Sequence, residues 1–243
     1  PLFNRHSFLM QKHIIQIRLH ALLLTVCLMF IGAEGLFAGD NNVFPNPPAS
    51  KLFFEENKNQ WPSQVKYQVD IPGGSLFLEN NTLTYNLMEN IDLHESSRNL
   101  EDAVTIRYNA YKVKFENANP APLIQGTDGY SFPRNYYRGN DPARWAENVS
   151  VFQGVKYESI YPGIDIKFYN SEQHLKYDFI IHPGANPQSI AMRYEGADEL
   201  HLEYGHLYIK TSVGVVLEQK PYAYQEINGV KTEVPCSYIL DGN

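Results

Sequence analysis

Cysteine is scarce in this chain, which has 2 in 243 residues, Cys27 and Cys236. Only Cys236 remains once the N-terminal segment considered below is removed, so no internal disulfide is expected. The stability of the domain must then come from its hydrophobic core. The 8 histidines are scattered singly, which disfavours a zinc site. The sequence also lacks an HExxH helix, a phosphate-binding loop and a nucleophile elbow, so no common catalytic motif is present.

Basic residues are outnumbered by acidic ones, with 20 Lys and Arg against 27 Asp and Glu. Removing residues 1–38 takes away three bases and one acid, which leaves 17 against 26 and a net charge of −9. Such a surface repels phosphate backbones, so nucleic acid is not expected as a partner.

Tyrosine and phenylalanine are abundant, with 17 and 13 residues, and turn formers recur throughout, with 16 Gly and 15 Pro. This mixture favours short strands joined by tight turns, and no long helical pattern appears outside the signal peptide. Roughly a dozen strands at close spacing predict an all-β fold, an antiparallel β-sandwich of two packed sheets. No repeat of fixed period is present, which disfavours a propeller within these residues.

Residues 1–38 have the pattern of an N-terminal extension and a secretory signal peptide. Met10 is the expected start, Lys12 and Arg18 supply the basic region, and residues 21–31 form the apolar region. Small residues then lead to an expected cleavage after Ala38, which predicts a secreted or cell-surface protein. The alternative is a membrane anchor, but the apolar run is too short to span comfortably, and no later segment is long enough.

A lipoprotein signal at Cys27 fits poorly, because Val26 stands where a small residue is expected. Residues 39–50 are rich in Pro and Asn and predict an extended linker before a β domain over residues 51–243. Because residues 236–240 begin a further alternating strand near Asn243, we expect this domain to be truncated at its C-terminal end.

The segment 135–190 contains the clearest strand pattern. Pro162-Gly163 predicts a turn, and apolar residues then alternate along residues 164–169 and 175–181. A four-residue loop, Ser171 to His174, aligns the two strands in a defined register. That register pairs Ile166 with Phe179, Phe168 with Tyr177, and Lys167 with Asp178.

Three other local signals are present. Asn228-Gly229 is a strong hairpin signal and pairs Ile227 with Val230. Asp141 followed by Pro142 predicts the start of a short helix. Residues 88–103 are acidic and without period-2 alternation, which favours an irregular excursion.

Carboxylates and histidines near the central hairpin suggest one catalytic alternative, glycoside hydrolysis by two acidic groups across a cleft. The candidates are Glu158, Asp165, Asp178, His174 and His182. Cross-strand pairing of Asp178 with Lys167, and a turn-capping role for Asp165, explain these acids without catalysis. We therefore expect a non-enzymatic domain.

Loop oxygens at Asp128-Gly129 and at Asn140 and Asp141 are weak candidates for Ca²⁺. No DxDxDG run accompanies them, and Asn and Asp occur in turns for backbone reasons. No cofactor is expected.

Aromatic residues in loop-like segments are candidates for a carbohydrate platform: Trp61, Tyr136, Tyr137 and Trp145. In a tyrosine-rich sandwich such rings also pack with the hydroxyl at the rim, so burial in the core is the alternative.

Five stretches carry a resemblance to a known family: FFEENKNQW (53–61), NYYRGNDPARWAENV (135–149), YESIYPGIDIKFY (157–169), KYDFIIHPGANPQSI (176–190) and KPYAYQEINGV (220–230). Together they resemble an uncharacterised N-terminal β domain of large exported proteins of gliding bacteria. The resemblance implies downstream β-propeller-type repeats, PKD or other Ig-like modules and a gliding-motility or type IX secretion sorting domain. It implies no catalytic residue.

We therefore expect an exported, non-enzymatic β module of a larger cell-surface or secreted protein, acting in surface architecture or adhesion. Its partners would be surface glycans or other cell-surface proteins. The alternative is a carbohydrate-binding module or a carbohydrate-active enzyme.

Overall fold

The protein is all-β in the computed structural model, which describes residues 12–19, 27–32, 52–89, 106–171 and 174–241. Within these residues twenty strands form three sheets, and the helices there are two 3-10 turns, η1 (Pro142–Arg144) and η2 (Pro187–Ser189). This confirms the expected antiparallel sandwich. The number of strands exceeds the dozen expected. Three of them have only three or four residues, and two lie within residues 12–32, where no strand was expected.

One long sheet contains fifteen strands in the order β19-β18-β2-β13-β12-β11-β3-β4-β5-β6-β7-β14-β1-β20, with β8 paired to β11 outside that path. Its strands are β1 (Lys12–Leu19), β2 (Cys27–Gly32), β3 (Phe54–Glu56), β4 (Tyr67–Ile71), β5 (Gly74–Leu78), β6 (Thr82–Met88), β7 (Tyr108–Phe115), β8 (Leu123–Gly129), β11 (Val151–Tyr161), β12 (Ile164–Ser171), β13 (His174–Ile181), β14 (Ala191–Glu195), β18 (Tyr222–Ile227), β19 (Val230–Val234) and β20 (Cys236–Asp241). The small sheets are β9 (Arg134–Tyr136) with β10 (Ala146–Val149), and β15 (Glu199–Glu203), β16 (His206–Thr211) and β17 (Gly214–Glu218).

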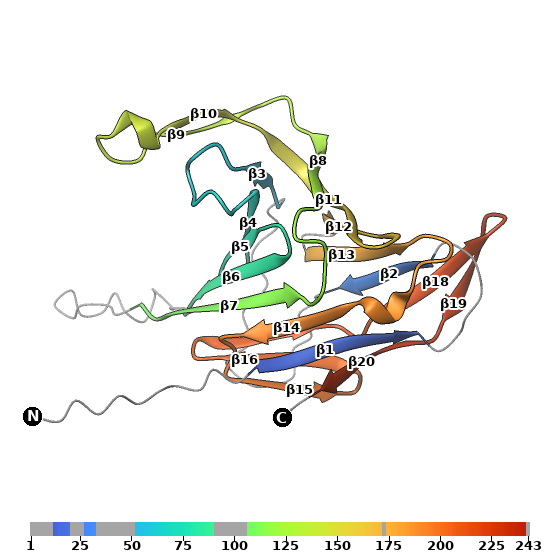
Figure 1. Ribbon diagram of the computed structural model, residues 1–243. Helices are drawn as coiled ribbons and strands as arrows, with labels where there is room; N and C mark the ends of the chain where they lie inside the picture. The colour runs from blue at the N-terminus through green and yellow to red at the C-terminus, as the bar shows by residue number, and fades with distance from the viewer. Residues whose placement is uncertain (1–11, 20–26, 33–51, 90–105, 172–173, 242–243) are drawn as a thin grey trace, which may run out of the picture.

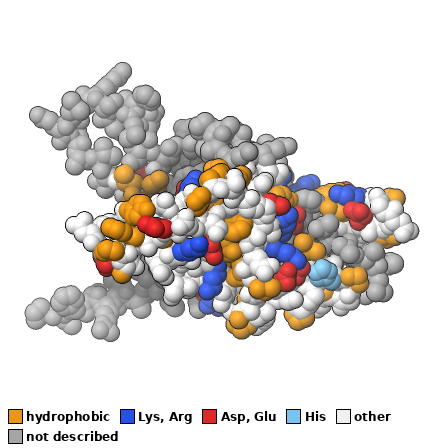
Figure 2. All heavy atoms as spheres, turned by 90° about the horizontal axis from the view of Figure 1, so that it is seen from above, with side chains coloured by type: hydrophobic (Ala, Val, Ile, Leu, Met, Phe, Trp, Pro, Cys, Tyr) orange, Lys and Arg blue, Asp and Glu red, His pale blue; other side chains and the backbone are white. Residues whose placement is uncertain are grey.

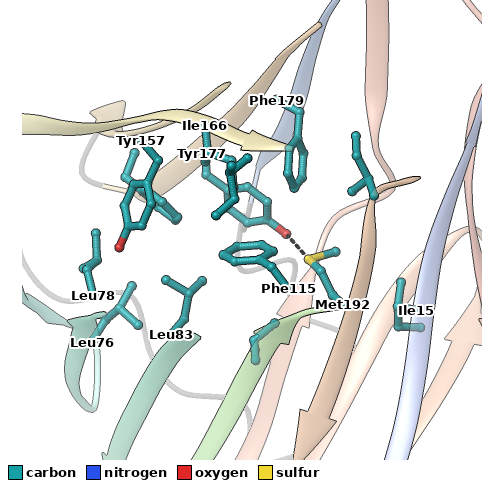
Figure 3. Close-up of a cluster of buried hydrophobic side chains, with 14 of the residues drawn as sticks. Ile15, Leu76, Leu78, Leu83, Phe115, Tyr157, Ile166, Tyr177, Phe179 and Met192 are labelled. Atoms are coloured by element: carbon teal, nitrogen blue, oxygen red, sulfur yellow. Dashed lines mark hydrogen bonds between the residues drawn. The ribbon is translucent and has the colours of Figure 1, made fainter. Parts of the chain in front are cut away.

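The long sheet bends over itself, so that β13 faces β7 and β14 across a shared core (Figure 1). The Phe115 and Phe179 rings meet edge to face at 6.2 Å, and the Tyr177 hydroxyl lies 3.8 Å from the Met192 sulfur (Figure 3). These side chains are buried and belong to one continuous hydrophobic cluster. The alternating apolar residues of each strand supply this cluster, as period-2 patterning requires.

The sheet β15–β16–β17 covers the same core and brings one carboxylate into it. Leu207 and Ile209 of β16 are fully buried, and Glu218 at the end of β17 is only 5% exposed. Tyr177 and Tyr194 donate hydrogen bonds to the two Glu218 carboxylate oxygens at 3.2 and 3.1 Å. Burial raises the pKa of Glu218 to about 7, although the tyrosine hydrogen bonds oppose that rise.

The central hairpin has the expected register. Ile166 pairs with Phe179, Lys167 with Asp178 and Phe168 with Tyr177. The connection is shorter than the loop expected from Ser171 to His174, because these two residues themselves pair as the last rung of the ladder. Cross-strand pairing at the outer face therefore extends as far as the turn.

Turn chemistry also agrees with the sequence. Pro162-Gly163 is a two-residue turn that joins Tyr161 to its partner Ile164, with Gly163 at φ +70°. Asn228 and Gly229 both have positive φ, which the expected tight hairpin turn between Ile227 and Val230 needs. The meander expected over residues 65–87 is present as β4, β5 and β6.

The N-terminal segment differs from the helix expected for a signal peptide in the parts that are described. β1 lies between β14 and β20, and β2 lies between β13 and β18. Ile15 and Ile17 alternate into the core, which explains strand rather than helix at this place. The expected linker 39–50 and most of the excursion 88–103 lie outside the described residues. No helix in the described ranges has the length and apolarity to cross a membrane.

Candidate functional site

A two-stranded arm, residues 134–149, extends from the body of the protein (Figure 1). It consists of β9, the turn η1 and β10. The Asp141 carboxylate accepts a hydrogen bond from the Ala143 backbone N–H at 3.0 Å, and Pro142 occupies the first position of the turn. The expected helix start is therefore confirmed as a single 3-10 turn, which closes the arm.

The tip of the arm presents two aromatic rings, Tyr137 and Trp145, called here the tip pair. Their exposed fractions are 57% and 38%, and the rings meet edge to face at 5.4 Å with an interplanar angle of 86°. The Tyr137 hydroxyl donates to the Glu147 carboxylate at 2.9 Å, and the Trp145 indole N–H donates to the Gly139 carbonyl at 3.1 Å. These bonds fix both rings while leaving much of their surface in water.

The base of the arm is held to the body by a buried carboxylate, Glu55 of β3. Glu55 is 1% exposed and accepts hydrogen bonds from Arg134 and from the Tyr136 hydroxyl. Burial raises the pKa of Glu55 above its usual range, while the Tyr136 hydrogen bond and the Arg134 charge oppose that rise. Burial and the neighbouring carboxylate raise the pKa of Tyr136 to about 12. Removing either partner would leave a buried polar group poorly satisfied.

Half-buried rings continue from Tyr136 along the body and are called here the inner group: Trp61, Phe77 and Tyr136. The Trp61 ring meets Tyr136 at 5.7 Å and 65°, and Phe77 at 6.1 Å and 72°. The Arg138 guanidinium lies 5.2 Å from the centre of the Tyr136 ring, a cation–π contact. The inner group thus packs with itself and with a cation.

A third set of rings lies beside Arg134. Phe53 meets Tyr130 at 5.2 Å and Phe132 at 5.9 Å, and the Arg134 guanidinium lies 5.1 Å from the Phe53 ring centre. Phe132 is 44% exposed. The view from the arm side shows hydrophobic side chains interspersed with acidic and basic ones (Figure 2). Aromatic and charged groups are therefore neighbours on this part of the surface.

The four aromatic residues expected at a ligand platform divide into two places. Trp61 and Tyr136 belong to the inner group, and Tyr137 and Trp145 form the tip pair. Both contacts are edge to face, so neither forms the coplanar platform on which a sugar ring could lie across two aromatic faces. None of the four residues is buried, which is also different from simple core packing.

Sequence reasoning missed Glu55, Arg134 and Phe53. Phe54 points into the core and is fully buried, so period-2 alternation assigns Glu55 to the opposite face. That face would ordinarily be solvated, and the sequence gives no sign that the arm covers it. The paired residues lie about eighty positions apart in the chain.

Two weak calcium candidates lie at the start of η1, and the third, Asp128, lies in β8. Asp141 uses its carboxylate to cap η1, and Asn140 lies exposed beside it. Within the ranges that the structure describes, no group of three or more His, Cys, Asp or Glu side chains is arranged to hold a metal ion.

Asp165 lies in a network of donors. Its carboxylate accepts from the Ser159 backbone N–H at 2.8 Å and from the Lys156 ammonium at 3.1 Å, and it contacts the His182 ring nitrogen at 3.1 Å. Burial favours the neutral acid, but the hydrogen bonds from Ser159, His182 and Lys156 outweigh it and hold the pKa of Asp165 below its usual range. The carboxylate is therefore charged and bound at neutral pH.

The other catalytic candidates are also engaged. Asp178 lies opposite Lys167 and accepts from the Tyr169 hydroxyl at 3.3 Å. Burial raises the pKa of Asp178 to about 7, against the effects of Tyr169 and Lys167. Glu158 pairs with Lys156 at 3.3 Å, and His174 is in the last rung of the central hairpin.

Comparison with known proteins gives a family but no activity. A domain of unknown function, DUF7948, matches residues 54–243. This chain belongs to the DUF7948 family. No curated protein and no solved structure matches it. The DUF7948 region begins at β3 and contains the whole arm and strands β3–β20, whereas β1 and β2 precede it.

Proposed function

We propose that this DUF7948 domain is an exported, non-enzymatic module of a larger cell-surface or secreted protein, acting in adhesion or surface architecture. The signal-peptide pattern of residues 10–38 supports export. The resemblance to exported proteins of gliding bacteria supports the larger protein, with downstream repeats and a type IX sorting domain. The negative net charge favours a partner other than nucleic acid.

The tip pair is the observation that carries the proposal. Two large rings stand exposed at the end of an arm, held by hydrogen bonds to Glu147 and Gly139. Exposed and fixed aromatic rings lose little conformational entropy when a partner covers them. The carboxylate of Glu147 and the nearby backbone supply polar groups for hydroxyls. Because the two rings are perpendicular, a sugar would stack on the face of one ring only, beside these polar groups, and we propose a carbohydrate as the ligand class.

Three bound carboxylates support a role without catalysis. Asp165 is engaged by the Lys156 ammonium and the Ser159 backbone N–H, Asp178 by the Tyr169 hydroxyl, and Glu158 by Lys156. A glycosidase needs an acid and a second carboxylate that both face one substrate cleft. Carboxylates occupied by structural partners are poorly suited to those roles.

The test is a glycan-array screen of the exported protein with three single variants. Tyr137→Ala and Trp145→Ala each remove one ring of the tip pair. Tyr204→Ala removes an 88% exposed ring in the turn between β15 and β16, away from the arm, and serves as the matched control. We expect selective glycan binding that falls at least about tenfold, about 1.4 kcal/mol, in both tip variants and is kept in the control.

Two other results are informative. Glycan binding that persists in both tip variants would show that the glycan-binding site lies outside the tip pair. If the native protein binds no glycan while its thermal unfolding is normal, the carbohydrate is the wrong ligand class and surface architecture alone stays as the proposal.

A further inference from the structure

The strand β19 lies at one end of the long sheet and has an open edge. Within the described residues it pairs with β18 alone, and the β18–β19 hairpin projects from the body of the protein (Figure 1). All residues of β19 except Val234 are exposed. The outer edge of β19 is therefore free to pair with a further strand.

The turn of the hairpin determines which backbone groups face this open edge. β18 and β19 are joined by two residues, with Ile227 and Val230 opposite each other on either side. In such a hairpin this first pair exchanges backbone hydrogen bonds, and hydrogen-bonded and non-hydrogen-bonded pairs then alternate. From Val230 on, every second residue directs its backbone groups toward β18. Lys231 and Glu233 direct theirs toward the open edge.

The charges of these two residues suit a second copy of the same strand. Antiparallel registers that bring their backbone groups together are centred on Lys231, on Thr232 or on Glu233. The first sets two lysines opposite each other and the last sets two glutamates opposite each other, and both arrangements are destabilising. The register centred on Thr232 sets Lys231 of each copy opposite Glu233 of the other. Opposite charges and backbone hydrogen bonds then coincide at the same two pairs.

The side chain of Lys231 is already ordered on the face that this pairing uses. Its ammonium lies 4.4 Å from the centre of the Tyr224 ring and donates to the Tyr224 hydroxyl at 3.2 Å. Tyr224 is the cross-strand partner of Glu233, so Lys231 and Glu233 lie on one face of the sheet. Less conformational entropy is lost when an ordered side chain is paired.

The same register also covers an exposed apolar side chain on the other face. Val230 is 64% exposed, and it would lie opposite Val234 of the second copy, which is 6% exposed and belongs to the hydrophobic core. This is a non-hydrogen-bonded pair, in which opposite side chains approach most closely. Pairing would therefore extend the core of each copy to Val230 of the other.

The charge pattern selects the occupant of the edge. A lysine on an edge strand disfavours pairing with most strands. The sequence of β19, Val-Lys-Thr-Glu-Val, places a base and an acid symmetrically about Thr232, so its own antiparallel copy supplies the opposite charge at both positions. We propose that two copies of this chain associate through β19 about a two-fold axis at Thr232. Such a contact closes at two copies. The inference goes beyond the proposed carbohydrate binding and does not depend on it.

The experiment is analytical ultracentrifugation of the full chain, residues 1–243, over a range of concentrations. Lys231→Glu and Glu233→Lys are made singly, and each places like charges at both pairs of a homodimer. An equimolar mixture of the two variants has opposite charges at both pairs of the heterodimer, and so has the homodimer of the double variant. Glu203→Lys, at an exposed residue of β15, changes the net charge as Glu233→Lys does and is the matched control.

We expect the native protein to form dimers, with a dissociation constant that rises at least about tenfold in each single variant and is unchanged in the control. The mixture and the double variant should dimerise like the native protein. Thermal unfolding checks that each variant is folded, and the double variant tests the register even where a single variant does not fold.

Four results would overturn the proposal. The native protein could stay monomeric at every concentration, or the single variants could dimerise as strongly as the native protein. The mixture and the double variant could stay as weakly associated as the single variants, which would refute the register. Species larger than dimers would refute a contact that closes at two copies.

Discussion

Changing Glu218 to Gln should remove a pH dependence of stability that is built into the core. Glu218 is buried under β13 and β14, and burial raises the pKa of its carboxyl from 4.5 to about 7. In the unfolded chain the same group has its ordinary pKa. The folded state therefore binds the proton more tightly, and the free energy of unfolding falls as pH rises from about 4.5 through about 7.

The magnitude follows from the size of that shift. At about 1.4 kcal/mol per pKa unit, the difference between 4.5 and about 7 corresponds to roughly 3 kcal/mol, most of it lost between pH 5 and pH 8. Gln is neutral at both values and its amide oxygen can still accept from Tyr177 or Tyr194. The free energy of unfolding of the variant, relative to that of the native protein, should therefore be about 2 kcal/mol higher at pH 8 than at pH 5.

The assay is urea unfolding of both proteins at the two pH values. Asp178, whose pKa is also about 7, titrates in both proteins and cancels in the comparison. A difference between native protein and variant that is the same at pH 5 and pH 8 would refute the argument, because Glu218 would then titrate alike in the folded and unfolded states.

Three further substitutions test the packing and the surface network. Phe168→Ala removes a fully buried ring that packs between two tyrosines, and should lower the free energy of unfolding by about 3–5 kcal/mol in chemical denaturation; a loss below about 1 kcal/mol would contradict its burial. Gly74→Ala would bring a Cβ within 2.0 Å of the Asn86 carbonyl oxygen. We therefore expect the free energy of unfolding to fall by about 1–3 kcal/mol and the melting temperature to fall with it. An unchanged melting temperature would disprove this close approach. Asp165→Asn should lower the free energy of unfolding at pH 7, and the difference from the native protein should shrink as pH falls through the lowered pKa of Asp165. A difference that grows in acid would contradict a lowered pKa for Asp165.

The central hairpin was predictable because its information is local. Apolar residues at even positions of one strand and odd positions of the next permit one register in which both sets are buried, and Pro162-Gly163 and Asn228-Gly229 specify their turns. The loop length was less certain from sequence, since Ser171 and His174 are equally compatible with a loop or a final rung.

The surface around the arm could be predicted only in part. Four aromatic residues were identified, but their division into the tip pair and the inner group depends on how β9 and β10 fold back over β3. The partnership of Glu55 with Arg134 depends on the same contact. Neither the grouping of the aromatic rings nor the Glu55–Arg134 pairing produces a periodic pattern in the sequence, because the residues come from separate loops and short strands.

The sequence by itself determined the fold class, the strand pairs joined by tight turns and the residues that alternate toward a core, since these follow from side-chain period and backbone preference at neighbouring positions. The tertiary structure decided which distant strands meet. It buried Glu55 under the arm, drew Glu218 in among tyrosines and set β1 between β14 and β20. Such contacts depend on the packing of the whole sheet, because the burial that stabilises them involves residues that are far apart in the chain.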